Sequence, residues 1–195
     1  GAGSIALTQA NNNFTGSVSL NNSGANNVAI NDANALDFGS STLGSGSLTV
    51  TAVGITQSGA ITVAGTSSFN AGTGVITLTQ SNDFTGAVSL NNSGANNVAI
   101  VDSNDITIGV TSLGTGTFAV TGSNIKLNSN VTTTNNIQTY TGNVVVNANS
   151  GGLPLVLSSG SGAIDITSNV DSASGFNHSL TFTSTGDVTI GGTIG

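Results

Sequence analysis

The stretch NNSGANNVAI at residues 21–30 recurs without a change at 91–100. It belongs to an internal repeat of 70 residues, in which 12–55 match 82–125 without a gap. Weaker matches continue the alignment, among them Asp32 with Asp102 and LGSG (43–46) with LGTG (113–116). Self-similarity at a fixed period is the signature of a repeat architecture, so it takes precedence over local patterns in predicting the fold.

Apolar residues recur as pairs with one residue between them, from Val18/Leu20 near the start to Val188/Ile190 near the end. A spacing of two is the period of a β-strand. Gly, Asn, Ser and Asp stand between the pairs, and these residues favour turns. No stretch has the i, i+3, i+4, i+7 pattern of a helix. The chain therefore predicts strands of three to five residues, with a new strand every 8–12 residues.

Strands this short are not stable alone. A β-sandwich has similar strand spacing, but it does not account for a long exact repeat. We therefore predict an all-β parallel β-helix (β-solenoid) with about 20–25 residues per coil and roughly eight coils. Residues 1–195 would form a single segment of a longer repetitive chain. The 70-residue period would be about three coils, which places the two copies in one column roughly 14 Å apart.

The period of two also predicts which side chains point inward. Buried positions are expected at Val28, Ile30, Leu48, Val50, Val98, Ile100, Phe118 and Val120. Outward positions are expected at Ser19, Thr49, Ser89 and Thr107. We also expect a strand at 18–20. The decapeptide that follows it would supply a turn, a corner and the approach to the next strand at 28–30.

Ten residues of the two decapeptides are predicted to have these structural roles: Asn21, Asn22, Gly24, Asn26, Asn27, Asn91, Asn92, Gly94, Asn96 and Asn97. Their amides are expected to stack on equivalent amides of the next coil. Gly24 is expected to supply a positive φ at the corner.

The composition argues against several functions. Eight Asp and one Lys (Lys126) are the only charged side chains besides His178, and there is no Cys. One cation cannot neutralise a row of phosphates, so no nucleic-acid partner is expected. No apolar run approaches the ~18 residues of a membrane-spanning helix. Clustered catalytic groups are missing around His178, so we predict no catalytic residues, no cofactor and no enzyme activity.

Asp32 and Asn34, and at the equivalent place Asp102, Asn104 and Asp105, offer oxygen atoms at alternate positions. This pattern suggests a calcium site. An Asx turn at a corner of the coil explains the same residues. The set is at least three oxygens short of a calcium shell, so we predict turns and no metal.

Residues 7–65, echoed at 78–122, and the ending LTFTSTGDVTIGGTIG at 180–195 resemble the repeats of large bacterial exoproteins of the filamentous haemagglutinin and autotransporter type. The resemblance implies a right-handed parallel β-helix on the outer surface of a Gram-negative cell. It also implies a stalk segment of an adhesin, whose receptor would be bound by parts outside 1–195. A self-assembling extracellular fibre of a biofilm matrix or sheath is the alternative. Adjoining coils and end-to-end or lateral copies are the expected partners, without membrane insertion.

Overall fold

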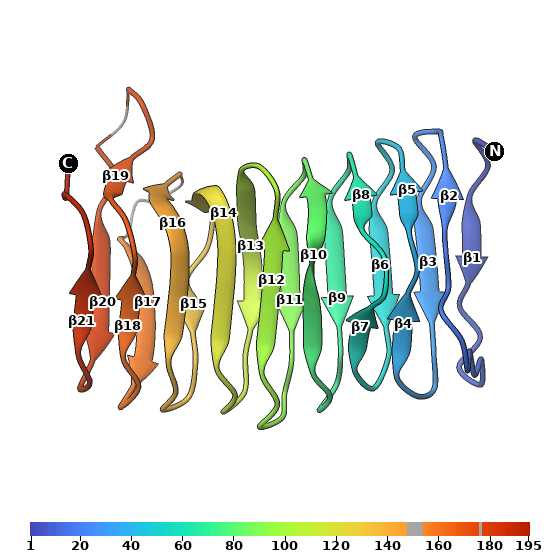
Figure 1. Ribbon diagram of the computed structural model, residues 1–195, viewed down its shortest axis with the longest axis horizontal. Helices are drawn as coiled ribbons and strands as arrows, with labels where there is room; N and C mark the ends of the chain where they lie inside the picture. The colour runs from blue at the N-terminus through green and yellow to red at the C-terminus, as the bar shows by residue number, and fades with distance from the viewer. Residues whose placement is uncertain (148–153, 176) are drawn as a thin grey trace.

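A computed structural model describes residues 1–147, 154–175 and 177–195. The chain winds into a stack of about nine coils of about 21 residues each, with its two termini at opposite ends of the stack (Figure 1). Every pairing between the described strands is parallel, and the described part of the chain contains no helix. The prediction of an all-β parallel solenoid is confirmed.

Each coil contributes up to three short strands, so the stack has three faces. The first face contains, in order, β1 (Ile5–Leu7), β3 (Val28–Asn31), β6 (Leu48–Thr51), β9 (Ser67–Asn70), β11 (Val88–Asn91), the end of β13 (Ile106–Ser112), β15 (Val131–Thr132), β17 (Leu155–Gly160) and β20 (Leu180–Ser184). The second face contains β4 (Leu36–Phe38), β7 (Ile55–Gln57), the start of β10 (Ile76–Phe84), β12 (Val98–Asp102), the start of β14 (Phe118–Leu127), the start of β16 (Gln138–Val146), β18 (Ile164–Ile166) and β21 (Val188–Ile190).

The third face is built from the remaining strands and from the far ends of the long ones. It contains β2 (Asn21–Asn22), β5 (Ser41–Leu43), β8 (Ile61–Val63), the end of β10, the start of β13, the ends of β14 and β16, and β19 (Val170–Ser172). The strands β10, β14 and β16 are long because they continue around the corner between the second and third faces.

The core is a set of stacked apolar rows inside the coils. All eight side chains predicted to point inward are at most 2% exposed. Of the four predicted outward positions, Ser19 and Thr49 are exposed and Ser89 and Thr107 are half-buried. Aromatic rings stack along the axis as well, since Phe118 meets Tyr140 edge to face with ring centroids 5.9 Å apart. The predicted register is therefore confirmed.

The two copies of the decapeptide do not share a column, and this corrects the expectation of three coils. Val28 pairs with Leu48, Leu48 with Ser67 and Ser67 with Val88, so Val88 lies three coils above Val28 on the first face. Val98 instead pairs with Ile76 on the second face. The 70-residue period thus equals three coils plus one face, which turns the second copy about the axis by one third of a turn.

The turn within the decapeptide begins later than predicted. Asn21 and Asn22 themselves form β2, and Asn91 ends β11, so the bend lies at 24–26 and 94–96. The expected strand at 18–20 is reduced to an isolated bridge between Val18 and Phe38. The rest of the decapeptide connects one face to the next.

Gly24 is not one of the glycines with positive φ, so the predicted reason for this glycine is wrong. The physical reason is close approach between coils. A Cβ atom at Gly24 would lie 2.6 Å from the carbonyl oxygen of Ala2. A Cβ at Gly94 would lie 3.0 Å from the carbonyl carbon of Thr73. The corners of successive coils stack backbone on backbone, and only glycine fits there.

The amides of the decapeptide bind backbone groups of adjacent coils rather than equivalent amides. The Asn26 amide donates to the carbonyl of Ala2 in the coil before, at 2.7 Å. The Asn27 side-chain oxygen accepts from the N–H of Ser47 in the coil after, at 3.0 Å. Asn91 alone among the ten residues follows the stacking prediction, because its amide donates to the side-chain oxygen of Asn70 at 2.7 Å.

Candidate functional site on the third face

The five calcium candidates do not form one cluster. Asp32 and Asp102 are 2% and 4% exposed. The Asp102 carboxylate accepts the N–H of Asn104 at 2.9 Å and the N–H of Phe84 in the preceding coil at 2.7 Å. The Asp32 carboxylate accepts the N–H of Asn34 at 3.1 Å in the same way. Both residues therefore make Asx turns and brace the corner to the coil before.

Burial raises the pKa of Asp102, and the two backbone N–H groups only partly offset this effect. The carboxylate oxygens already accept backbone hydrogen bonds, so they are poorly available as metal ligands. Within 1–147, 154–175 and 177–195, no three His, Cys, Asp or Glu side chains lie close enough together to hold a metal ion.

Asp105 differs from Asp102 because it lies outside the core and meets the lone lysine. Its carboxylate is 2.9 Å from the Lys126 ammonium, and both side chains are a little over one third exposed. The Asn124 amide donates to the other carboxylate oxygen at 2.7 Å. Lys126 and then Asn124 lower the pKa of Asp105. The ion pair joins the start of β13 to β14, so it connects two successive coils.

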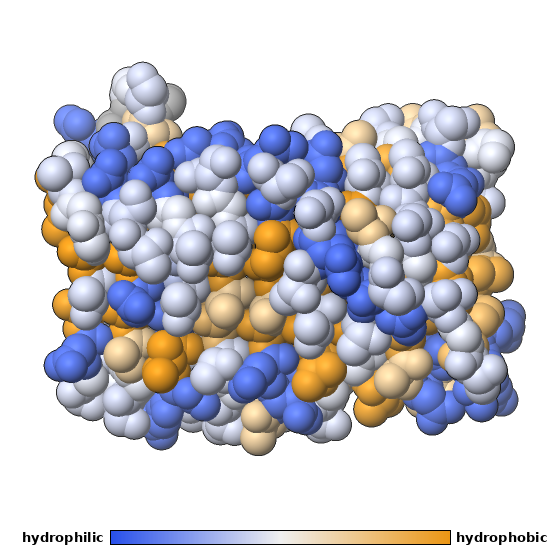
Figure 2. Space-filling model, viewed as in Figure 1, coloured by the Kyte–Doolittle hydropathy of each residue, from blue (hydrophilic) through white to orange (hydrophobic). Residues whose placement is uncertain are grey.

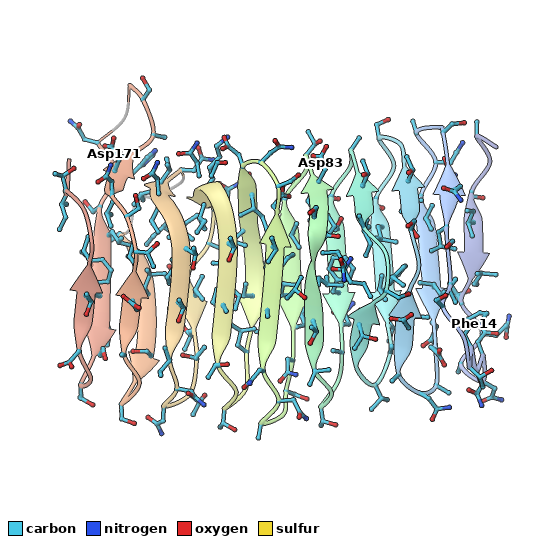
Figure 3. All side chains as sticks on the ribbon, in the orientation of Figure 1. Phe14, Asp83 and Asp171 are labelled. Carbon is cyan, nitrogen blue, oxygen red and sulfur yellow. The ribbon has the colours of Figure 1, made fainter. Side chains whose placement is uncertain are left out.

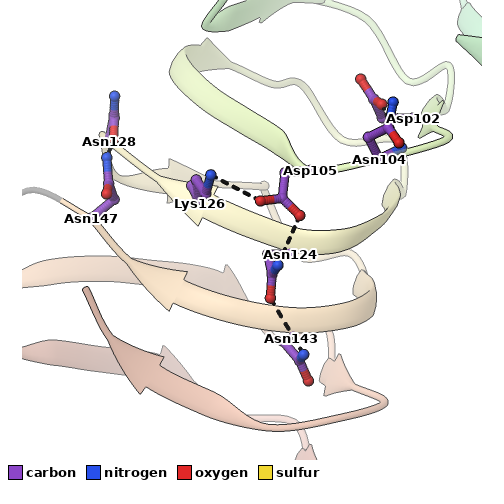
Figure 4. A network of polar contacts seen from close by, with 8 residues as sticks. All are labelled: Asp102, Asn104, Asp105, Asn124, Lys126, Asn128, Asn143 and Asn147. Carbon is purple, nitrogen blue, oxygen red and sulfur yellow. Dashed lines mark hydrogen bonds and ion pairs between the residues drawn. The ribbon is translucent and has the colours of Figure 1, made fainter. Parts of the chain in front are cut away.

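A row of amides continues from this ion pair along the axis (Figure 4). The Asn143 amide donates to the Asn124 side-chain oxygen at 3.4 Å, and the Ser168 hydroxyl donates to the Asn143 oxygen at 2.6 Å. A second amide pair lies beside this row, where Asn147 donates to Asn128 at 2.6 Å. Amides therefore do stack between coils, mainly at the third face, whereas within the decapeptides only Asn91 stacks in this way.

A hollow of about 450 Å³ opens beside the ion pair. It spans three successive coils and is lined by Asp83, Thr85, Asn104, Asp105, Thr107, Ser123 and Lys126. A second hollow of about 560 Å³ lies further along the stack, with Lys126 and Asp171 in its lining. Asp83 and Asp171 both lie at the upper edge of the stack in Figure 3. Figure 2 shows hydrophilic side chains gathered along the same edge.

His178 lies in the segment before β20, where its N–H donates to the Ser172 hydroxyl at 3.0 Å. It lines a small hollow of about 140 Å³ with apolar neighbours such as Val146 and Leu180. Asp171 is the one Asp among the described residues that lines that hollow.

No helix in the described segments has the length and apolar character of a membrane span.

A family model described as "Repeats of unknown function (DUF5649)" matches residues 1–21 and 25–91. No curated protein and no solved structure matches the chain. The matched residues fall in the first half of the stack, and they include the first copy of the repeat except for residues 22–24. Together with the coiled architecture, the match defines the chain as a repeat protein of the parallel β-solenoid class.

Sequence reasoning identified Lys126 as the lone cation and Asp105 as a calcium candidate, but it did not bring them together. It also missed Asp83 as part of the same hollow. A signal was present in the alignment of the two copies. The second copy and the residue that follows it carry Asp83, Asp105 and Lys126 where the residues 70 positions earlier are Asn13, Ala35 and Thr56.

Proposed function

We propose that residues 1–195 form a rigid, non-enzymatic stalk segment of a bacterial adhesin that is secreted or attached to the cell surface. The observation that supports this proposal is the way each coil binds its neighbours on three faces. Parallel ladders connect successive coils on each face, and corner side chains such as Asn26 and Asp102 add further bonds between coils.

A stack of this kind extends by about 4.8 Å per coil, so nine coils reach about 43 Å. Each added coil needs only the one before it for support, which makes length easy to gain by copying a block of sequence. The chain has only one Lys and eight Asp, and Asp32 and Asp102 are buried, so the surface is nearly uncharged. Such a surface also suits a spacer that binds little along most of its length.

In this proposal, the receptor-binding and anchoring parts belong to other regions of the polypeptide. The segment's partners are adjoining coils of the same chain, and it lies outside the outer membrane of a Gram-negative cell. These statements follow the sequence resemblance to exoproteins of the filamentous haemagglutinin type.

A replacement experiment in the native polypeptide tests the stalk function. Cells expressing the gene without codons 1–195 should lose surface attachment while antibodies still detect the remaining parts outside the cell. An unrelated nine-coil solenoid inserted at the same place should restore attachment, because extension does not depend on side-chain identity. If the native segment restores attachment but the unrelated solenoid does not, the segment is more than a spacer. Salt-insensitive polymers of the purified segment would favour the fibre alternative instead.

A further inference from the structure

We propose that the hollow beside Asp105 and Lys126 is a binding site for a neutral saccharide. This inference does not rest on the stalk function, because a spacer and a fibre could each carry such a site. The hollow is open at the surface, away from both ends of the stack, and it spans three successive coils. Its volume of about 450 Å³ falls in the usual range for small-molecule sites.

The first argument is the concentration of charge. The sequence has only nine Lys and Asp side chains, and three of them, Asp83, Asp105 and Lys126, line this one hollow. They come from three successive coils, so they are brought together by the fold and not by a run of charges in the sequence. Charged side chains are otherwise sparse along the stack.

The second argument is the comparison between the two copies of the repeat. The copies are identical over the decapeptide, yet Asn13, Ala35 and Thr56 stand in place of Asp83, Asp105 and Lys126. Ala35 directly precedes β4 and Thr56 lies within β7, and these two strands pair in the same parallel manner. The charges are therefore not needed to form a corner or a strand of this solenoid, and their role lies at the surface.

The chemistry of the lining indicates the class of ligand. Carboxylates at Asp83 and Asp105 accept hydrogen bonds, the Lys126 ammonium donates them, and the Asn104 amide does both. Hydroxyl groups of a sugar match such a mixture of donors and acceptors. Two acids against one cation disfavour a polyanion, and the lining offers no large apolar side chain for an apolar ligand.

The lining is also held in place before any ligand arrives. Lys126 and Asn124 fix the two oxygens of Asp105 at 2.9 and 2.7 Å, and Asn143 in turn contacts Asn124. Fixed side chains lose less conformational entropy on binding, so even a shallow site can bind usefully. Equivalent side chains in successive coils recur about every 4.8 Å, which favours an extended oligosaccharide lying along the axis.

The test is an NMR titration of the ¹⁵N-labelled protein with cellohexaose, maltohexaose and xylohexaose, and with anionic hexagalacturonate for comparison. At least one neutral hexasaccharide should shift the backbone amides of Thr107, Ser123 and Lys126. A triple variant, Asp83→Asn with Asp105→Ala and Lys126→Thr, installs the residues of the first copy. It should weaken that binding at least about tenfold, because charge-assisted hydrogen bonds are lost.

The matched control is Asp165→Asn, an acid on β18 of the second face, which should leave binding unchanged. Circular dichroism establishes that both variants keep the β-fold. The proposal is overturned if no neutral hexasaccharide shifts the lining amides, if the triple variant binds as tightly as the unmodified chain, or if hexagalacturonate binds more tightly than all three. None of these results would bear on the stalk function, whose test measures attachment of cells.

Discussion

Single asparagines decide how one coil is attached to the next. Asn92 accepts the N–H of Gly94 at 2.9 Å and donates to the Gly74 carbonyl of the coil before. Asn97 accepts the N–H of Thr117 of the coil after, at 3.0 Å. The first copy makes the same bonds from its own asparagines. A repeated sequence therefore repeats a set of backbone contacts, and an amide suits this task because it both donates and accepts.

Two buried serines, Ser67 and Ser41, are expected to change stability in opposite directions when each is replaced by alanine. Ser67 is 3% exposed in the core row between Leu48 and Val88, and among the described residues its hydroxyl is the one buried side-chain group without a hydrogen-bond partner. Removing an unsatisfied buried hydroxyl favours folding. We expect Ser67→Ala to increase the free energy of unfolding by about 1 kcal/mol in urea denaturation.

Ser41→Ala is the matched variant. Ser41 is equally buried, but its hydroxyl accepts the Leu20 N–H at 2.9 Å and donates to the Gly39 carbonyl at 3.1 Å. The alanine would leave Leu20 N–H without a partner, so we expect a loss of about 1–3 kcal/mol. Loss of stability in both variants would contradict the assignment of Ser67 as unsatisfied.

Strands in this molecule are stabilised by their neighbours along the axis and not by their own length. Most have three to five residues, and the shortest, β2 and β15, have two. Isolated strands of this size are unstable, but each one here pairs in parallel with at least one other coil. Side chains on the outer surface add contacts between the same strands, as Asp105 and Lys126 do between β13 and β14.

The pKa of Asp105 provides a test of that contact. Lys126, followed by Asn124, holds this pKa below its usual range. We expect Lys126→Met to raise the pKa of Asp105, and Asn124→Ala to raise it by a smaller amount, in a carboxyl ¹³C NMR titration. Asp105→Asn serves to assign the resonance. An unchanged pKa in Lys126→Met would show that the ion pair does not persist in solution.

The lowered pKa of Asp105 also predicts how the stability of the fold changes with pH. A carboxyl whose pKa is lower in the folded than in the unfolded state stabilises the fold at pH above its unfolded pKa, about 3.9. That contribution is lost as pH falls through the lower, folded value. The unmodified chain should therefore lose its stability advantage over Lys126→Met on acidification through this window, when the unfolding midpoints of the two are compared.

Two of the three corners of the stack accept the same sequence. The decapeptide joins the third face to the first in copy one and the first to the second in copy two. In both copies the next coil places a glycine on the corner, Gly44 over Gly24 and Gly114 over Gly94. A duplicated block therefore fits the solenoid even when it does not equal a whole number of coils, which relaxes the constraint on how such a chain lengthens.

Deletion of residues 28–97 tests this equivalence of corners. The deletion joins Asn27 to Val98 and restores an intact decapeptide. Asp102 would then accept the N–H of Phe14, as Asp32 does at 3.3 Å, in place of Phe84. We expect a cooperatively folded β-protein that is shorter by about 16 Å in small-angle X-ray scattering, the height of three and a third coils.

A second deletion of the same length supplies the control. Removing 62–131 joins Ile61 to Thr132 and connects the third face to the first without a corner. This variant should lose cooperative unfolding, monitored by circular dichroism. Equal stability of the two shortened chains would contradict the idea that the repeat matches the corners.

The sequence by itself determined the solenoid, the approximate average length of its coils and its core register. A spacing of two between apolar residues can bury only one side of a strand, so Val28, Ile30, Leu48 and Val50 had to point inward. It also indicated the Asx turns at Asp32 and Asp102, because an Asx turn is a local bond from a side chain to the backbone two residues on.

Only the tertiary structure decided which residues of successive coils lie side by side. The coil length varies, from 19 residues between Leu48 and Ser67 to 26 between Gln138 and Ile164. The 70-residue period therefore does not reveal how far the second copy is turned about the axis unless the pairing between strands is known. The hollow at Asp105 and Lys126 has the same cause. Its lining comes from three coils, and proximity between coils depends on the accumulated lengths of all the turns between them.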